Sequence, residues 1–115
     1  MTMQNHLFVV FTNSVQGTDA EFNQWYNQHH QHEVVAVRGI RSCQRFALSN
    51  VQFPLAPKWP WQYLALYEIE TDNPAACMQA LTDAISTGVV SMSDTMDPDI
   101  ASWVFQPIHP RISSS

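Results

Sequence analysis

Four short segments are rich in apolar, β-branched and aromatic residues, which is the pattern of β-strands. They span residues 6–12, 40–49, 62–70 and 102–108. In the first segment both alternating sets of side chains are apolar, namely Leu7, Val9 and Phe11 against Phe8 and Val10. A strand with one face in water would instead alternate apolar with polar residues. The sheet that contains this strand is therefore expected to be covered on both faces.

The other strands add detail to this picture. The segment 62–70 is again apolar on both sides through Leu66. In the segment 40–49, strict alternation divides the side chains into two faces, with Ile40, Phe46 and Leu48 on one and Arg41, Cys43, Arg45 and Ala47 on the other. The segment 50–60 contains three prolines, which a central strand does not tolerate, and is predicted to be a connecting loop. Because this loop carries Phe53 and Trp59, we expect it to pack over a pocket or against a partner.

The first predicted helix runs from Asp19 to Val37. Projected at about 100° per residue, one broad arc collects most of its large side chains. The arc contains Phe22, Trp25, Tyr26, His29, Glu33, Ala36 and Val37, with His30 at one edge and His32 at the other. Thr18 and Glu21 have the spacing of a capping box, in which each side chain bonds the other residue's amide. Gly39 is expected to end the helix because glycine readily takes the left-handed conformation.

The second predicted helix begins at Pro74 and ends before Gly88. Asn73 is placed to cap it, and proline is favoured at the first helical position. Apolar residues recur at helical spacing within it, at Cys77, Ala80, Leu81, Ala84 and Ile85. The following segment, 89–100, is polar apart from Val90, Met92 and Met96, and its stretch Ser91–Asp99 is predicted to be a solvated rather than a catalytic loop.

The order of elements is β-α-β-β-α-β, the ferredoxin-like pattern of an α+β fold. Two helices then cover one face of a four-stranded antiparallel sheet, in a single domain that spans residues 1–115 with a solvated tail at 111–115. The second face remains apolar and has no element of this chain left to cover it. A homodimer with the two sheets face to face, closing an α/β barrel, resolves this conflict.

Composition narrows the function. The chain has 115 residues, of which 45% are apolar and 13% charged, with a net charge of −5. Its five basic residues are scattered, so neither nucleic acid nor an anionic membrane surface is expected as a partner. There is no apolar run of membrane-spanning length and no signal-peptide pattern, so we expect a soluble cytoplasmic protein. The two cysteines, Cys43 and Cys77, lack the CxxC spacing and are expected to be reduced and buried.

The predicted first helix carries the candidate chemistry. Trp25, Tyr26, His29, His30 and Glu33 place polar groups in an otherwise apolar wall, the composition of a small-molecule pocket. A histidine there titrates near neutrality and can transfer a proton. The helical projection favours His29 as the histidine that faces this pocket. Alternatively, the phenol and imidazole side chains merely satisfy each other or backbone carbonyls.

The sequence supports a metal site or a cofactor site less than it supports proton transfer by a histidine. His29 is three residues from His32 and four from Glu33, so two ligands could share a helix face. The remote candidate is His109, and a zinc or iron site needs three or more convergent ligands. We therefore expect no metal. With three glycines in total the chain has no glycine-rich phosphate loop, and it has no GxSxG motif. We expect no cofactor.

The run Phe22-x-x-Trp25-Tyr26-x-x-x-His30-x-x-Glu33, ending at Gly39, resembles the first-helix motif of EthD-like proteins in the dimeric α/β-barrel superfamily. Arg45-Phe46 and the run 63–68 are similar to the strands of that family. The resemblance implies a homodimer with a cleft between helices and sheet in each protomer. It also places the motif histidine at His30. The family commonly has prolines where this chain has His32 and Arg38, so we expect a straighter helix here.

Relatives in that superfamily include cofactor-free monooxygenases, isomerases, dehydratases and decarboxylases. The resemblance thus implies an enzyme acting on a small apolar aromatic or carbonyl compound, with His30 transferring the proton and Tyr26 orienting the substrate or stabilising an oxyanion. The expected substrate-binding residues are Trp25, His29, Glu33, Phe46, Trp59 and Trp61. Two alternatives stay open at this point: a non-catalytic module that binds a hydrophobic ligand or assists an enzyme, and a structural dimer without a ligand.

Overall fold

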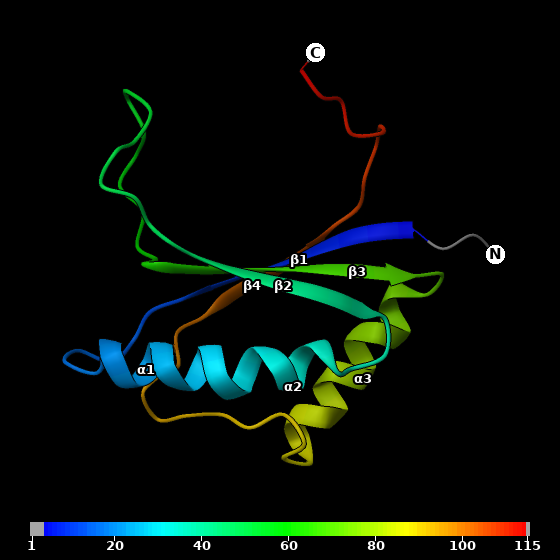
Figure 1. The fold of residues 1–115 in the computed structure, drawn as a ribbon, viewed down its shortest axis with the longest axis horizontal. Helices are drawn as coiled ribbons and strands as arrows, with labels where there is room; N and C mark the ends of the chain where they lie inside the picture. Colours follow the sequence, from blue (N-terminus) through cyan, green and yellow to red (C-terminus); the bar gives the residue numbers. More distant parts are fainter. Residues whose placement is uncertain (1–3, 115) are drawn as a thin grey trace.

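A computed structural model describes residues 4–114, and its four strands form one antiparallel sheet (Figure 1). The strands are β1 (Gln4–Thr12), β2 (Ile40–Ala47), β3 (Tyr63–Thr71) and β4 (Ala101–Phe105), arranged in the order β2-β3-β1-β4. Each neighbouring pair runs antiparallel. This is the ferredoxin-like α+β fold that the order of elements predicts.

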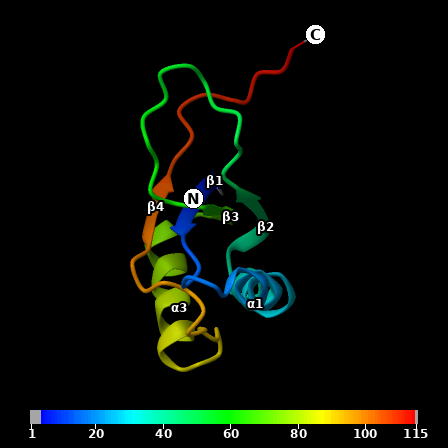
Figure 2. The same cartoon turned by 90° about the vertical axis from the view of Figure 1, so that its left-hand side faces the viewer.

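The helices lie together on one face of the sheet (Figure 2). The first helical stretch is continuous from Asp19 to Val35 and consists of α1 (Asp19–Trp25), a π-helical turn η1 (Tyr26–His30) and α2 (Gln31–Val35). The second is α3 (Pro74–Ser86). Both helices were predicted to within two residues at each end. Among the described residues, no helix is long and apolar enough to cross a membrane.

Three of the predicted helix signals act as expected. The Asn73 side chain accepts a hydrogen bond from the Ala76 amide at 3.1 Å, directly ahead of Pro74. Gly39 and Gly88 follow their helices with φ of 97° and 81°, the left-handed region that glycine tolerates. The capping box was wrong. The Thr18 hydroxyl donates to the Val15 carbonyl at 2.7 Å and makes no side-chain cap to the helix.

Strand β2 contains a β-bulge that alternation alone does not predict. Ile40 pairs with Ile69, but Ser42 already pairs with Glu68, so one extra residue lies in β2. The bulge places Ile40 on the same side as Cys43 and Arg45, facing the helices. The predicted grouping of Ile40 with Phe46 was therefore wrong, because the extra residue reverses the alternation beyond it.

The core lies between the helices and the sheet. Its largest fully buried side chains are those of Tyr26, Tyr67, Phe22, Ile69 and Val90. Val90 and the buried Met96 belong to the segment 87–100, which crosses the helix layer and forms a bridge from Ser14 to Met96. The prediction that Ser91–Asp99 is a solvated loop was wrong at Met96, which is buried and packs into the core.

The sheet face away from the helices, here called the open face, carries exposed apolar side chains. They include Leu7, Phe46, Leu48, Trp59, Trp103 and Phe105. The Phe11 ring lies 5.1 Å from that of Trp59 and 6.0 Å from that of Trp103. Residues 48–62 and 106–114 project from the same side as two arms (Figure 1), and the aromatic loop has no helix or strand over 48–62.

Candidate functional site

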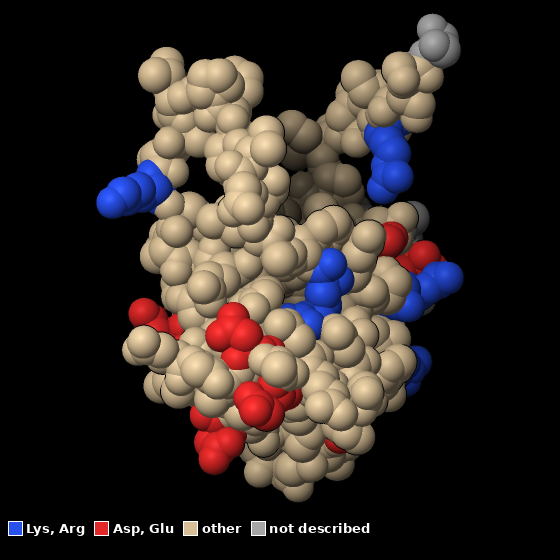
Figure 3. All heavy atoms as spheres, turned by 60° about the vertical axis from the view of Figure 1, so that its left-hand side comes forward, with Lys and Arg blue, Asp and Glu red and all other residues tan. Residues whose placement is uncertain are grey.

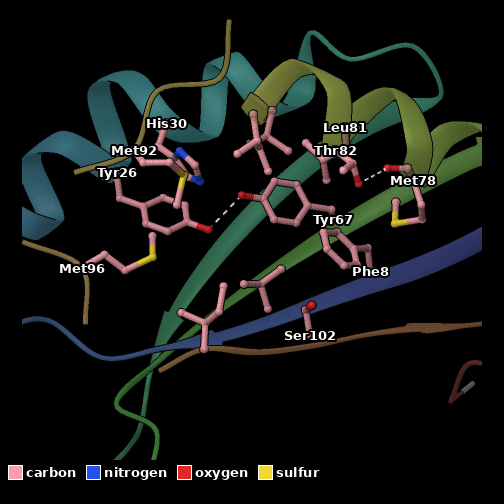
Figure 4. A pocket seen from close by; sticks show the side chains of 14 residues that line it. Phe8, Tyr26, His30, Tyr67, Met78, Leu81, Thr82, Met92, Met96 and Ser102 are labelled. Carbon is pink, nitrogen blue, oxygen red and sulfur yellow. Dashed lines mark hydrogen bonds between the residues drawn. The ribbon is translucent and has the colours of Figure 1, made fainter. Parts of the chain in front are cut away.

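A cavity of about 280 Å³ lies between the helices and the sheet, in the predicted place (Figure 4). Its volume is close to the lower limit of small-molecule sites, roughly 300 Å³. The lining is mostly apolar and contains three methionines. The lining residues are Phe8, Val10, Tyr26, His30, Val34, Tyr67, Met78, Leu81, Thr82, Ile85, Met92, Met96, Ile100 and Ser102.

The π-helical turn explains which side chains of the first helix face the core. Its buried residues are Phe22, Tyr26, His30 and Val34, each four positions after the last. On a regular α-helix each such step overshoots a full turn by about 40°, so the row would drift off the core. The wider turn over Tyr26–His30 absorbs one extra residue and brings His30 and Val34 back into line. The helix is thus not the regular one that the absent prolines suggested.

His30 is 6% exposed and lines the cavity. Its Nδ1 lies 2.9 Å from the Ser91 carbonyl oxygen, and because a carbonyl can only accept, Nδ1 carries the hydrogen. In the neutral ring the lone pair is then on Nε2, which has no hydrogen-bond partner among the described residues. Burial lowers the pKa of His30, which favours this neutral form. The arrangement provides a base.

The hydroxyls of Tyr26 and Tyr67 lie 2.9 Å apart, pointing toward one another at the cavity wall (Figure 4). The Tyr26 ring also packs edge-on against His30, with centroids 4.7 Å apart. Burial raises the pKa of Tyr26 to about 12 and that of Tyr67 further in the same direction. Both phenols therefore stay protonated at neutral pH and act as hydrogen-bond donors rather than bases.

Arg45 of β2 stacks on the ring of Tyr26. Its guanidinium carbon lies 4.2 Å from the centroid of the Tyr26 ring. Two of its nitrogens donate to the side-chain oxygens of Asn27 at 2.7 Å and Asn23 at 3.0 Å. Arg45 was placed on a strand by the sequence but not in the site. The sequence feature that could have indicated this position is that Arg45 lies two residues after Cys43 and therefore on the same strand face.

Glu33 and Ser91 fasten the segment 87–100 to the helix. A Glu33 carboxylate oxygen accepts from the Ser91 amide at 3.0 Å and from the Ser91 hydroxyl at 2.7 Å. These hydrogen bonds hold the pKa of Glu33 below its usual value. Glu33 was predicted to bind substrate, but it does not line the cavity and instead supports the residue that orients His30. Ser91 could not be found from sequence, because it is one serine in a polar segment.

The other predicted substrate-binding residues fall into two groups. Trp25 is half-buried with its ring 4.6 Å from that of His30, behind the cavity wall, and His29 is exposed to solvent. Phe46, Trp59 and Trp61 lie on the open face, in a separate hollow of about 170 Å³ beside Phe11. The sheet separates these three residues from His30, so the six residues expected to bind substrate do not line one cavity.

The structure adds site residues that the sequence did not indicate. Phe8 and Tyr67 come from strands, Met92 and Met96 from the segment 87–100, and Ser102 from β4. Among residues 4–114 no three His, Cys, Asp or Glu side chains converge as a metal site would require. Both cysteines are free thiols, Cys77 buried and Cys43 half-buried.

The burial of His30 predicts a pH dependence of stability. In the unfolded chain this histidine titrates near 6.5, whereas its pKa in the folded protein is lower. As pH falls below about 6.5 the unfolded state therefore binds a proton that the folded state does not, and the free energy of unfolding decreases. Glu33 and Arg45, the charged groups that act on this ring, keep their charges over this range.

Urea unfolding of the wild type and of His30→Gln between about pH 7.5 and 5.5 measures this effect. The wild type should lose up to about 1.4 kcal/mol more per pH unit than the variant. The other four histidines are common to both proteins and cancel in the comparison. Equal pH slopes would show that His30 is not held in its neutral form.

Comparisons with known proteins support the fold and no more. No protein-family model matches the chain, and no curated protein matches it. Among solved structures, it is similar to a Dabb family protein with a ferredoxin-like fold from Mesorhizobium loti. The TM-score is 0.64 at 10% sequence identity, with 92% of this chain and 99% of that one covered. At this identity the likeness shows the ferredoxin-like fold alone.

Proposed function

We propose that this protein is a homodimeric, EthD-like, cofactor-independent enzyme that transfers a proton on a small, largely apolar aromatic or carbonyl compound. One observation carries the proposal: a neutral imidazole with an unpartnered Nε2 lines the same cavity as a pair of buried tyrosine hydroxyls. Imidazole is the commonest general base of enzymes, and a buried phenol is a suitable donor to an oxygen that gains charge.

The cavity lining defines the ligand class. None of the described Asp, Glu, Lys or Arg side chains lines the cavity. An ionic ligand group would lose its hydration there without a direct counter-charge, so the ligand that enters is uncharged. Three methionine side chains suit a flat aromatic ring, since sulfur contacts with aromatic rings are favourable and methionine adapts its shape.

The geometry supports a simple division of roles. Nε2 of His30 takes a proton from a carbon or oxygen of the ligand, and the Nδ1 hydrogen bond to Ser91 stabilises the resulting imidazolium. A hydroxyl of the tyrosine pair donates to the ligand oxygen on which negative charge develops. The mostly apolar lining weakens the competition from water and so strengthens both interactions.

The dimer is proposed from the open face. Val9, Leu66 and Trp103 lie side by side on it across three strands, and a monomer would leave this apolar surface in water. The two arms carry exposed apolar side chains, with Phe53 83% and Leu55 101% exposed. Figure 3 shows Lys and Arg atoms on both arms and a hollow between them, with Asp and Glu atoms gathered lower on the body. A second copy fits between the arms.

The ring opening of a nitrobenzisoxazole tests the proposed chemistry. This small, flat and uncharged probe loses its ring C–H proton to a base as the N–O bond breaks, which leaves a nitrile and a coloured phenolate. We expect saturable ring opening by the wild type. Ser102→Phe, which fills the cavity from β4, should lower the rate at least about tenfold. Ser86→Phe, at an exposed position outside the lining, is the matched control.

The same experiment separates catalysis from binding alone. The internal hydrogen bonds of Tyr26 to Tyr67 and of His30 to Ser91 would also suit a module that only holds a hydrophobic ligand. Such a module would bind the probe in the cavity without opening its ring. Ring opening that Ser102→Phe leaves unchanged would mean that the reaction takes place elsewhere on the protein.

A further inference from the structure

Arg45 is a half-buried cation without a carboxylate partner. Among the described residues no Asp or Glu forms an ion pair with it, whereas Arg41 pairs with Glu70 at 2.9 Å on the surface. Its hydrogen-bond acceptors are the neutral amides of Asn23 and Asn27, and its Nε is buried with no hydrogen-bond partner. Holding an uncompensated positive charge in a partly dehydrated position costs free energy.

The aromatic rings around Arg45 supply part of the compensation. Its guanidinium carbon lies 4.2 Å from the centroid of Tyr26, 5.4 Å from that of Phe22 and 5.6 Å from that of Tyr63. The shortest of these contacts is with the ring whose hydroxyl reaches the cavity. Arg45 itself does not line the cavity, so a ligand cannot touch the guanidinium directly. Tyr26 contacts both the guanidinium and the cavity.

We propose that the reacting oxygen of the ligand gains negative charge, as in an enolate or a phenolate, and that Arg45 is a positioning residue which stabilises this charge through the ring and hydroxyl of Tyr26. This inference rests on the proposed function. It identifies the substrate class more closely, as a compound with an enolisable carbonyl or an acidic hydroxyl.

The physical reason is that the hydroxyl and the ring of Tyr26 are electronically coupled. When the hydroxyl donates to an oxyanion, electron density moves into the phenol ring, and a cation over the ring face becomes more favourable. The titratable groups that pack on this ring are His30, Cys43, Arg45 and Tyr67. Of these only the guanidinium is charged at neutral pH, since burial lowers the pKa of His30 and raises the pKa of Cys43.

Two probes of the same shape separate charge from packing. para-Nitrophenol ionises to an oxyanion, and para-nitrotoluene replaces that oxygen by a methyl group. We expect nitrophenol to enter the wild-type cavity uncharged and to give its proton to His30, so that the bound form is nitrophenolate, and we expect Arg45→Gln to bind it about tenfold more weakly at the same pH. The affinity for nitrotoluene should not change. Arg45→Lys keeps the charge and should retain most of the nitrophenolate affinity, which also covers the case that the glutamine variant does not fold.

A double-mutant cycle shows whether Arg45 acts through Tyr26. Tyr26→Phe should lose about as much nitrophenolate affinity as Arg45→Gln, and the double variant should lose little more than either. Additive losses, or equal losses in the Lys and Gln variants, would overturn the role assigned to Arg45. Failure of the wild type to bind either probe would instead overturn the proposed function, so the two results are distinguishable.

Discussion

Replacement of His30 by glutamine should slow the ring opening of a nitrobenzisoxazole by about 10²- to 10⁴-fold, the usual contribution of a positioned general base. The glutamine amide can still donate to the Ser91 carbonyl, so the cavity wall should stay in place. Because the substitution removes the base and preserves the packing, the affinity for para-nitrotoluene should remain within a fewfold of the wild type. Stopped-flow absorbance of the phenolate product gives the rate.

His29→Gln is the matched control for this experiment. It makes the same change one residue earlier, on the exposed side of the helix, and should leave the rate unchanged. If both variants retain the wild-type rate, imidazole is not the base. A loss in His29→Gln alone would assign the chemistry to the solvent-facing side of the helix.

Substitution of Val9 by aspartate should convert the proposed dimer to a monomer. Val9 lies on the open face between Leu66 of β3 and Trp103 of β4, near the centre of the proposed interface. Two-fold symmetry buries two unpaired carboxylates for each substitution, and each costs about 3–5 kcal/mol. The dissociation constant should therefore rise more than 100-fold. Sedimentation equilibrium measures it, with the wild type expected at twice the 13.1 kDa of one chain.

Val89→Asp controls for the substitution itself. Val89 is 68% exposed in the segment after α3, on the helix side of the molecule, and its change should leave the dimer intact. A wild type that sediments as a single chain at micromolar concentration contradicts the proposed assembly. In that case the apolar open face would need another partner.

The fold could be predicted because its determinants are local. The apolar runs of β1 and β3 and the cap of α3 by Asn73 depend on neighbours within a few positions. The bulge in β2 could not be predicted in the same way, because it depends on the register with β3. The capping box failed because the Thr18 hydroxyl faces the carbonyl oxygens of Val15, at 2.7 Å, and of the distant Thr95, at 3.3 Å, and its oxygen makes no bond to the helix amides.

The candidate site was only partly accessible from sequence. The helical projection favoured His29, whereas the structure buries His30, because the projection assumes a regular α-helix and the chain makes a π-helical turn. The motif resemblance selected His30 because a motif depends on the number of residues between positions and does not assume a fixed rotation per residue. Tyr67, Arg45 and Ser91 reach the site from other elements, and their separation in sequence hid them.

The π-helical turn makes the site depend on the length of a segment as well as on its side chains. A regular α-helix over the same residues 26–30 would rotate everything after it by about 100°. Removing one residue from the turn would instead restore the α-helix and leave Val34 and the residues that follow in their present places against the sheet. A distant relative with one residue fewer between Tyr26 and His30 would then carry these two side chains three positions apart on a regular helix, still on one face. Insertions and deletions are therefore as informative as substitutions for tracing this site among related chains.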